Sequence, residues 1–164
     1  MEKKFVSCVT KAQKMKLAEA LNLRADTQTR VAQLKERLLS NVKVQEGDEP
    51  AESPQALFSE LDAALKSLQE LILRINKTNL STVWEGRTLT DMIAEKDILS
   101  LRLSVLREVL ADASVRGDRF SRNEIKFVRT IDIAVLQKQI DDYSKQLREL
   151  DVKLQQANWM TDLL

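Results

Sequence analysis

A ribbon of apolar residues at heptad spacing runs through the C-terminal part of the chain and restricts its fold more than any other feature. Its members follow one another at unbroken alternating steps of four and three residues and are Leu136, Ile140, Tyr143, Leu147, Leu150, Leu154 and Ala157. This spacing places them on one face of an α-helix and is typical of a coiled-coil seam, which must pack against another helix. Asp132 precedes the ribbon and can cap this helix.

Two segments in the N-terminal half carry stripes of the same type. We predict a first helix over residues 15–42, where leucines and Val31 recur at helical spacing. Ser53 and Pro54 mark the start of a second helix, because Ser can accept from the first N–H groups and Pro is tolerated in the first turn. The second stripe steps 3-4-3-4-3 and consists of Phe58, Leu61, Leu65, Leu68, Ile72 and Ile75. This spacing predicts a second coiled-coil seam.

A third helix is predicted from Thr88, which forms a capping box with Asp91, although Glu or Gln is usual at that position. Its main stripe is Met92, Leu99, Leu103, Leu106 and Leu110. A second group broadens the apolar face and consists of Ile98, Leu101, Val105 and Val109. A wide apolar face predicts that this helix is the most buried of the four.

The connecting regions are less regular. Residues 76–87 contain Asn, Thr, Ser and Gly86, which predicts a connection with a short extended piece. Residues 115–130 are the least helical part, and the alternation over residues 125–129 predicts a strand or extended loop that could pair with residues 80–84. The predicted fold class is therefore all-α, with four long amphipathic helices in an antiparallel bundle or coiled coil and a short two-stranded β element in the connecting regions.

Composition supports long helices and restricts the class of protein. The chain has 164 residues with three Gly and two Pro, which leaves few turns for a multi-stranded β fold. Cys8 is the only cysteine, so no intrachain disulfide can form and a reducing cytoplasm is expected. No apolar run is long enough to span a membrane, and no secretion signal is present. We expect a cytoplasmic protein with a single helical domain over residues 15–164 and an N-terminal extension or arm over residues 1–14.

The residues needed for common catalytic sites are missing. The chain has no histidine, which removes the commonest general base and zinc ligand, and it has no glycine-rich phosphate loop. The carboxylate pairs Asp141 with Asp142 and Glu60 with Asp62 do not fit a di-iron site, because residues one or two apart on a helix do not face each other. We therefore expect no enzymatic activity, no cofactor and no metal site.

Arginines gather in the irregular segment before the fourth helix. They suggest a phosphate- or RNA-binding patch, but the 26 Lys and Arg are balanced by 25 Asp and Glu, so nucleic-acid binding is disfavoured and a solvated loop is the simpler interpretation. Polar residues also gather at helix ends, where helix termination explains them without a ligand. The candidate surface for a ligand or partner consists of Arg87, Arg119, Arg122, Asn123, Asn158 and Trp159.

Several short motifs resemble those of a family of small bacterial helical proteins of unknown function that are labelled septicolysin-like. The motifs are MKLAEAL at residues 15–21, RAD at 24–26, KVQEG at 43–47, EP at 49–50, RINKTN at 74–79, GRTLTD at 86–91, EIKFV at 124–128 and ANW at 157–159. The resemblance covers nearly all of the chain from Met15 onward. It implies a cytoplasmic helical protein, supplies no catalytic residue, and its label implies a membrane-acting cytolysin.

Three functions follow from these patterns. The leading hypothesis is a non-enzymatic helical interaction or scaffold protein that forms a homo-oligomer, because the seams can bury against sister chains as readily as within one chain. The first alternative is a binder of a small ligand or nucleic acid that uses the arginine-rich loop end. The second alternative is a membrane-acting protein, without stable insertion, that uses amphipathic helices.

Overall fold

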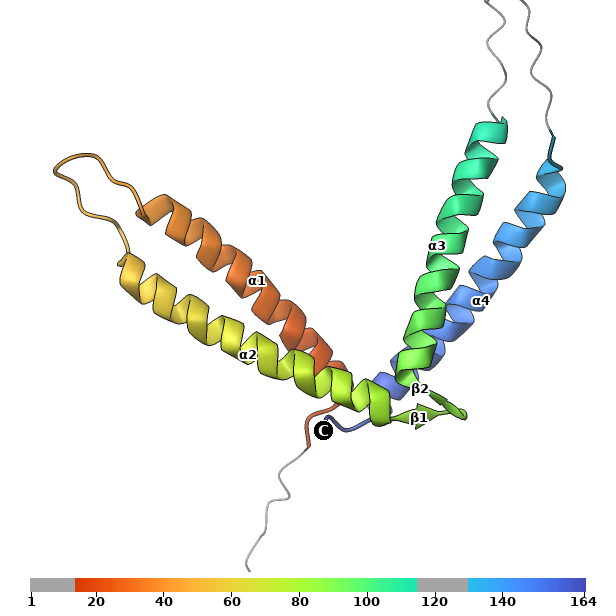
Figure 1. The fold of residues 1–164 in the computed structure, drawn as a ribbon, viewed down its shortest axis with the longest axis horizontal. Coiled ribbons are helices and arrows are strands. Elements are labelled where there is room, and N and C mark those ends of the chain that lie inside the picture. Colours follow the sequence, from red (N-terminus) through yellow and green to blue (C-terminus); the bar gives the residue numbers. More distant parts are fainter. Residues whose placement is uncertain (1–13, 115–129) are drawn as a thin grey trace, which may run out of the picture. The chain divides into compact units, whose positions relative to one another are not determined.

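The computed structural model describes residues 14–114 and 130–164, and within them it is almost entirely helical (Figure 1). The elements in chain order are α1 (Leu17–Asn41), α2 (Pro54–Ser81), β1 (Val83–Trp84), β2 (Arg87–Thr88), α3 (Leu89–Ser114) and α4 (Ile133–Met160). The predicted all-α fold with four long helices and a small two-stranded sheet is confirmed. Of the predicted N-terminal arm, residues 1–13 lie outside the described part of the chain.

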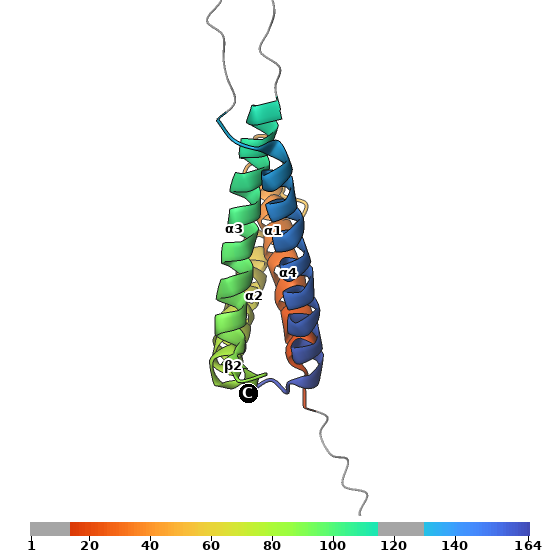
Figure 2. The ribbon, with the colours of Figure 1, turned by 90° about the vertical axis from the view of Figure 1, so that its right-hand side faces the viewer.

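The described residues fall into two compact units. The first contains the chain up to Thr78 together with Asn158–Leu164, and the second contains Asn79–Ala157. Each unit is built around a pair of antiparallel helices, α1 with α2 and α3 with α4 (Figures 1 and 2). The chain segments of α2 and α4 contribute to both units.

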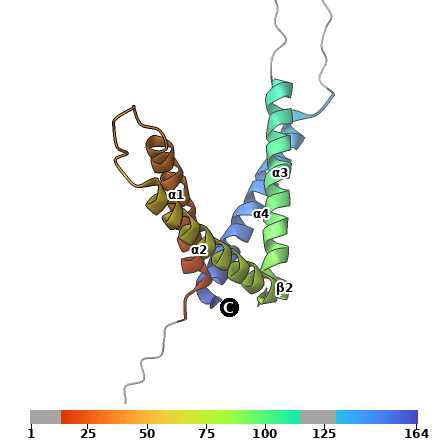
Figure 3. The ribbon, with the colours of Figure 1, turned by 60° about the vertical axis from the view of Figure 1, so that its left-hand side comes forward.

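Helices α1 and α2 form a coiled-coil hairpin that is closed by the connection between them (Figure 3). The buried and half-buried positions of α1 repeat at steps of three and four residues from Leu17 to Asn41, and those of α2 do the same from Leu57 to Thr78. A core cluster joins Leu34 and Leu38 to Leu57 and Ala64. The two helices therefore pack through one heptad seam, as expected for a coiled coil.

The seam on α2 differs from the predicted one. Leu57, Ala64 and Leu71 are buried, whereas Phe58 and Leu65 are exposed. Both sets repeat every seven residues, so the sequence pattern is compatible with either set as the buried seam. In the structure Glu60 flanks the seam and lies 3.6 Å from Arg30 of α1, an ion pair that fits the observed rotation of α2.

Helix α2 also continues to Ser81, so the predicted connection over residues 76–87 begins too early. Thr78 is fully buried in the last turns, where its hydroxyl donates to the carbonyl of Arg74 at 2.8 Å. The same hydroxyl accepts the N–H of Leu164 at 3.0 Å. Thr78 is accommodated within the helix because these bonds satisfy its hydroxyl inside the unit.

The C-terminal residues tie the first unit together. The N–H of Leu17 donates to the carbonyl of Thr161 at 2.9 Å, and the N–H of Leu163 donates to the carbonyl of Met15 at 2.8 Å. Lys16 pairs with Asp162 at 2.6 Å. This antiparallel bridge satisfies a backbone donor at the start of α1 that would otherwise lack a partner.

The second unit begins with a β-hairpin. Val83 pairs with Thr88 and Trp84 with Arg87, and the turn between them has positive φ at Glu85 (50°) and Gly86 (81°). Positive φ at both central residues is the type I′ geometry, which matches the twist of a tight hairpin. The predicted strand near residues 80–84 thus pairs within this hairpin, while the stretch 125–129 lies outside the described residues.

The hairpin leads directly into α3 through the predicted capping box. The hydroxyl of Thr88 accepts the N–H of Asp91 at 3.1 Å, and the carboxylate of Asp91 accepts the N–H and the hydroxyl of Thr88. Asp132 likewise caps α4, since its carboxylate accepts the N–H groups of Ala134 and Val135. Both predicted helix starts are confirmed.

The predicted ribbon of α4 packs against α3. One core cluster joins Leu103 of α3 to Leu136 and Ile140 of α4, with Tyr143 and Leu147 packed against it. The second group on α3 does not contribute, because Ile98, Leu101, Val105 and Val109 are 42% to 61% exposed. The prediction that α3 is the most buried helix is therefore wrong, since only one of its two apolar stripes faces α4.

Candidate functional site

The residues predicted to form a ligand or partner surface do not form one described site. Arg87 lies in β2 of the second unit, whereas Asn158 and Trp159 lie in the last turn of α4 in the first unit. Asn158 is half-buried, and the Trp159 side chain is 57% exposed. The other three predicted residues, Arg119, Arg122 and Asn123, lie outside the described residues.

Arg87 borders a shallow pocket between the β-hairpin and the helices α3 and α4. Its guanidinium lies 2.6 Å from Glu95, and Lys153 donates to Glu85 at 2.7 Å. The pocket has a volume of about 230 Å³, and its lining residues are Trp84, Glu85, Arg87, Met92, Glu95, Gln146, Glu149, Leu150 and Lys153. Both cations of the pocket are therefore paired with carboxylates, so neither offers an unneutralised charge to an anionic ligand.

The electrostatics of this pocket agree with that pairing. The hydrogen bond from Lys153 to Glu85 raises the pKa of the lysine above its ordinary value. The Nε1 group of Trp84 is shielded from solvent and has no hydrogen-bond partner in the described part of the chain. A buried indole N–H usually finds an acceptor, so Trp84 leaves an unsatisfied donor inside the packed unit, and its burial keeps this donor from a molecule in the pocket.

A second groove lies on one side of the α1–α2 hairpin. It has a volume of about 390 Å³ and is lined by Asp26, Thr29, Arg30, Gln33, Leu34, Arg37 and Glu60. Arg37 pairs with Glu52 and with Glu60, and the bond to Glu52 raises the pKa of Arg37 and lowers that of Glu52. These solvent-exposed charges pair with one another. This side of the hairpin therefore offers little unneutralised charge to a ligand.

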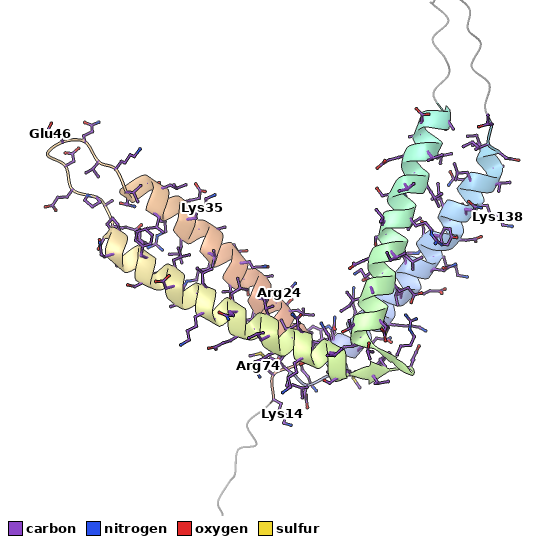
Figure 4. All side chains as sticks on the ribbon, in the orientation of Figure 1. Lys14, Arg24, Lys35, Glu46, Arg74 and Lys138 are labelled. Carbon is purple, nitrogen blue, oxygen red and sulfur yellow. The ribbon has the colours of Figure 1, made fainter. Side chains whose placement is uncertain are left out.

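The opposite side of the hairpin is apolar. On α2, Phe58 is 50% exposed, Leu65 is 44% exposed and Ile72 is half-buried. On α1, the corresponding positions are half-buried Leu21 and exposed Gln28 and Lys35 (Figure 4), and exposed Val42 follows the last residue of the helix. We call Phe58, Leu65, Ile72, Leu21 and Val42 the apolar flank.

The apolar flank is unusual for a coiled coil of two helices. Positions beside the seam are normally charged on both sides, where they pair across the helices. Here one side follows this rule through Arg30, Arg37 and Glu60, while the other presents large apolar side chains. This asymmetry marks the apolar flank as the surface of the first unit that is best suited to contact a partner.

No group of three or more Cys, Asp or Glu side chains in residues 14–114 and 130–164 is arranged to hold a metal ion. None of the described helices combines the length and the apolarity required to cross a membrane.

Comparisons with known proteins identify relatives but no activity. The model of a family of unknown function (DUF6847) matches residues 24–163. A crystal structure of a functionally unknown conserved protein from Corynebacterium diphtheriae is 40% identical and superposes with a TM-score of 0.86, covering 93% of this chain and 100% of that chain. Among curated proteins, none is significantly similar to this chain.

These matches correct the resemblance drawn from the short motifs. The chain is matched by DUF6847 and by the Corynebacterium protein, and no septicolysin-like family is indicated. The label of a cytolysin therefore has no support.

Proposed function

The chain belongs to DUF6847, a family of unknown function, and we propose that it is a non-enzymatic helical interaction protein that assembles with a second copy of itself through the apolar flank. The observation that carries this proposal is the exposure of Phe58 and Leu65 beside the α1–α2 seam. The absence of histidine and of a phosphate loop from the sequence supports a non-enzymatic role.

The width of the apolar face on α2 supports assembly. A coiled coil of two helices needs a narrow stripe, whereas a helix of a four-helix bundle carries a third apolar position in each heptad. Helix α2 has that third position, since Phe58, Leu65 and Ile72 each follow a buried seam residue by one step. Two copies of the hairpin would supply the four helices that this pattern fits.

The apolar flank also suits a two-fold axis. Phe58 and Ile72 lie equally far along α2 on either side of Leu65, at a total spacing of about 21 Å. An axis near Leu65 would place Phe58 of each copy opposite Ile72 of the other, which is the self-complementarity that an isologous dimer requires.

Light scattering coupled to gel filtration tests this proposal. We expect a mass of twice the 18.7 kDa of one chain at micromolar concentration. Leu65→Glu should yield a monomer, because it places a charge in the centre of the contact. Leu73→Glu is the matched control, since Leu73 is exposed on α2 but lies off the apolar flank, and this variant should remain dimeric.

Circular dichroism should show equal helix content in both variants, because both side chains are exposed. A strict monomer for the unmodified protein would contradict the proposal. A dimer that Leu65→Glu leaves intact would remove the apolar flank as its contact surface.

The alternative function, a binder of a small ligand or nucleic acid, has weaker support. Arg87 is neutralised by Glu95, and the pocket beside it carries three carboxylates against two cations. Such a balance does not favour an anionic ligand.

A further inference from the structure

Helix α3 has two apolar stripes, and α4 covers one of them. The covered stripe includes Leu99 and Leu103, which are buried. The second stripe consists of Ile98, Leu101, Val105 and Val109, whose side chains are 42% to 61% exposed. Steps of three, four and four residues keep these side chains on one face, which points away from the seam with α4. We call this surface the outer face of α3.

A helix that is apolar on opposite sides is normally buried on both. Scattered exposed leucines need no explanation, but four consecutive members of one helical stripe form a contiguous patch of the kind that marks an interaction site. The outer face of α3 therefore has the character of a contact surface for a partner other than α4.

The charges around the outer face indicate the chemistry of that partner. The acidic residues Asp91, Asp97, Glu108 and Asp112 are all exposed on the same side of the helix as the second stripe. Asp91 also caps the helix through Thr88, and Glu108 accepts a hydrogen bond from Ser104. Asp97 and Asp112 have no ion pair within residues 14–114 and 130–164.

The basic residues of α3 do not neutralise this surface, because all three are engaged with α4. Lys96 pairs with Asp151. Arg107 donates to the hydroxyl of Ser144 at 3.4 Å, and the guanidinium of Arg102 lies 4.8 Å from the ring centre of Tyr143. The outer face is consequently an apolar stripe bordered by carboxylates.

We propose that the outer face of α3 binds a cationic amphipathic helix of a partner protein. The apolar side of that helix packs on Ile98, Leu101 and Val105, while its lysines and arginines pair with the bordering carboxylates. The inference goes beyond self-assembly through the apolar flank and does not depend on it.

The same charges disfavour two other occupants. The outer face of a second copy would bring like carboxylates together along the whole contact, which is repulsive. An anionic lipid surface would be repelled for the same reason, since such surfaces attract basic segments. Of these three occupants, a helix with basic residues beside an apolar stripe is the one whose charges complement the outer face of α3.

A synthetic peptide tests the proposal directly. The probe is a fluorescent amphipathic helix of about 18 residues made of Leu and Lys, a length at which an isolated helix can form. Its counterpart replaces every Lys with Glu. We expect a saturable rise in fluorescence anisotropy with the Lys peptide, weakened by added salt, and no binding of the Glu peptide.

Three variants locate the binding surface. Leu101→Ser removes the centre of the stripe, and the double variant Asp97→Lys with Asp112→Lys reverses the border charge. Each should weaken binding by about tenfold or more, equivalent to about 1.4 kcal/mol. The matched control is Asp141→Lys with Asp142→Lys, which makes the same charge change at exposed positions of α4 and should leave the affinity within about twofold.

Each alternative outcome overturns the proposal. Equal loss in the α3 and α4 charge variants would mean unspecific electrostatic attraction, and unchanged binding by Leu101→Ser would remove the apolar stripe from the contact. Failure of the Lys peptide to bind would leave the outer face to another occupant. None of these three results would alter the light-scattering behaviour of Leu65→Glu. Failure of peptide binding to the outer face of α3 is therefore distinguishable from failure of self-assembly.

Discussion

At the scale of single residues, Arg24 is the least conventional member of the α1–α2 seam. It occupies a half-buried heptad position on α1, and its Nε group is shielded from water without a hydrogen-bond partner among the described residues (Figure 4). A buried N–H group without an acceptor costs free energy that a well-placed hydrogen bond would offset. Polar residues at such positions can also set the register of a coiled coil.

We predict that Arg24→Leu stabilises the protein by about 1 kcal/mol or more, because the seam gains apolar contact and loses a buried donor that has no partner among the described residues. Urea unfolding followed by circular dichroism measures the change, with Glu36→Leu as a control at an exposed position of α1 that lies off the seam and off the apolar flank. A lower free energy of unfolding for Arg24→Leu would mean that the guanidinium has an acceptor in the folded protein.

The cap of α3 gives a second prediction at this scale. Thr88→Ala removes the hydroxyl that accepts the N–H of Asp91, and we expect a loss of about 1 kcal/mol in the free energy of unfolding. Thr90→Ala changes a neighbouring exposed Thr outside the cap and should have a smaller effect. Equal losses in the two variants would indicate that the cap contributes nothing.

The same cap predicts a dependence on acid. The hydroxyl and N–H of Thr88 bind the carboxylate of Asp91 and hold its pKa below the ordinary value. A depressed folded pKa stabilises the protein above the unfolded pKa of about 4, and this contribution is lost as the pH falls through the folded pKa. The melting temperature should therefore fall on acidification below pH of about 4, and Asp91→Asn should make that fall shallower. If the melting temperature of Asp91→Asn fell as steeply, the acid dependence could not be assigned to the Asp91 carboxylate.

At the scale of elements, α3 contains a direct comparison between a covered and an uncovered stripe. Leu103 is 1% exposed within the cluster that joins α3 to α4, whereas Leu101, two residues earlier, is 61% exposed. We predict that Leu103→Ala costs about 2 to 5 kcal/mol, because it leaves a cavity in the seam. Leu101→Ala should change the free energy of unfolding by only about 0.5 kcal/mol. Chemical denaturation of the two variants tests this, and similar losses would mean that both stripes are covered.

The elements also show where heptad spacing is decisive and where it is ambiguous. On α4 a single apolar stripe matches the heptad spacing, and this stripe packs against α3. On α2 two stripes repeat every seven residues and share Leu61, Leu68 and Ile75, so the choice between them depends on how α2 is rotated against α1. That rotation places Glu60 beside Arg30 and leaves Phe58 and Leu65 exposed.

At the scale of the whole molecule, the proposed self-assembly would couple stability to protein concentration. A dimer that forms only from folded chains is stabilised by mass action, so the melting temperature of the unmodified protein should rise with protein concentration. The melting temperature of Leu65→Glu should be independent of concentration, and that of Leu73→Glu should follow the unmodified protein. Calorimetry over a hundredfold range of about 1 to 100 μM makes the comparison. A constant melting temperature for the unmodified protein would contradict a dimer.

The candidate site was only partly accessible from the sequence. Arg87 was identified as a candidate, but its environment depends on Lys153, which pairs with Glu85 across 68 residues of sequence. The donor of Trp84 could not be recognised as unpartnered, because hydrogen-bond satisfaction is a property of the packed unit. The apolar flank was present in the sequence as the stripe of Phe58, Leu65 and Ile72, but it was assigned to the interior.

The local pattern of the chain was sufficient to determine its all-α class, its four helices, the capping box at Thr88 and the ribbon on α4. These features depend on hydrogen bonds and side-chain spacing within a few residues, which a sequence displays directly. The tertiary structure alone decided which apolar stripes of α2 and α3 are covered, that α2 extends to Ser81, and that the C-terminal residues bind the start of α1. The physical reason is that burial of a stripe requires a second helix at a particular rotation, and contacts between distant segments set that rotation.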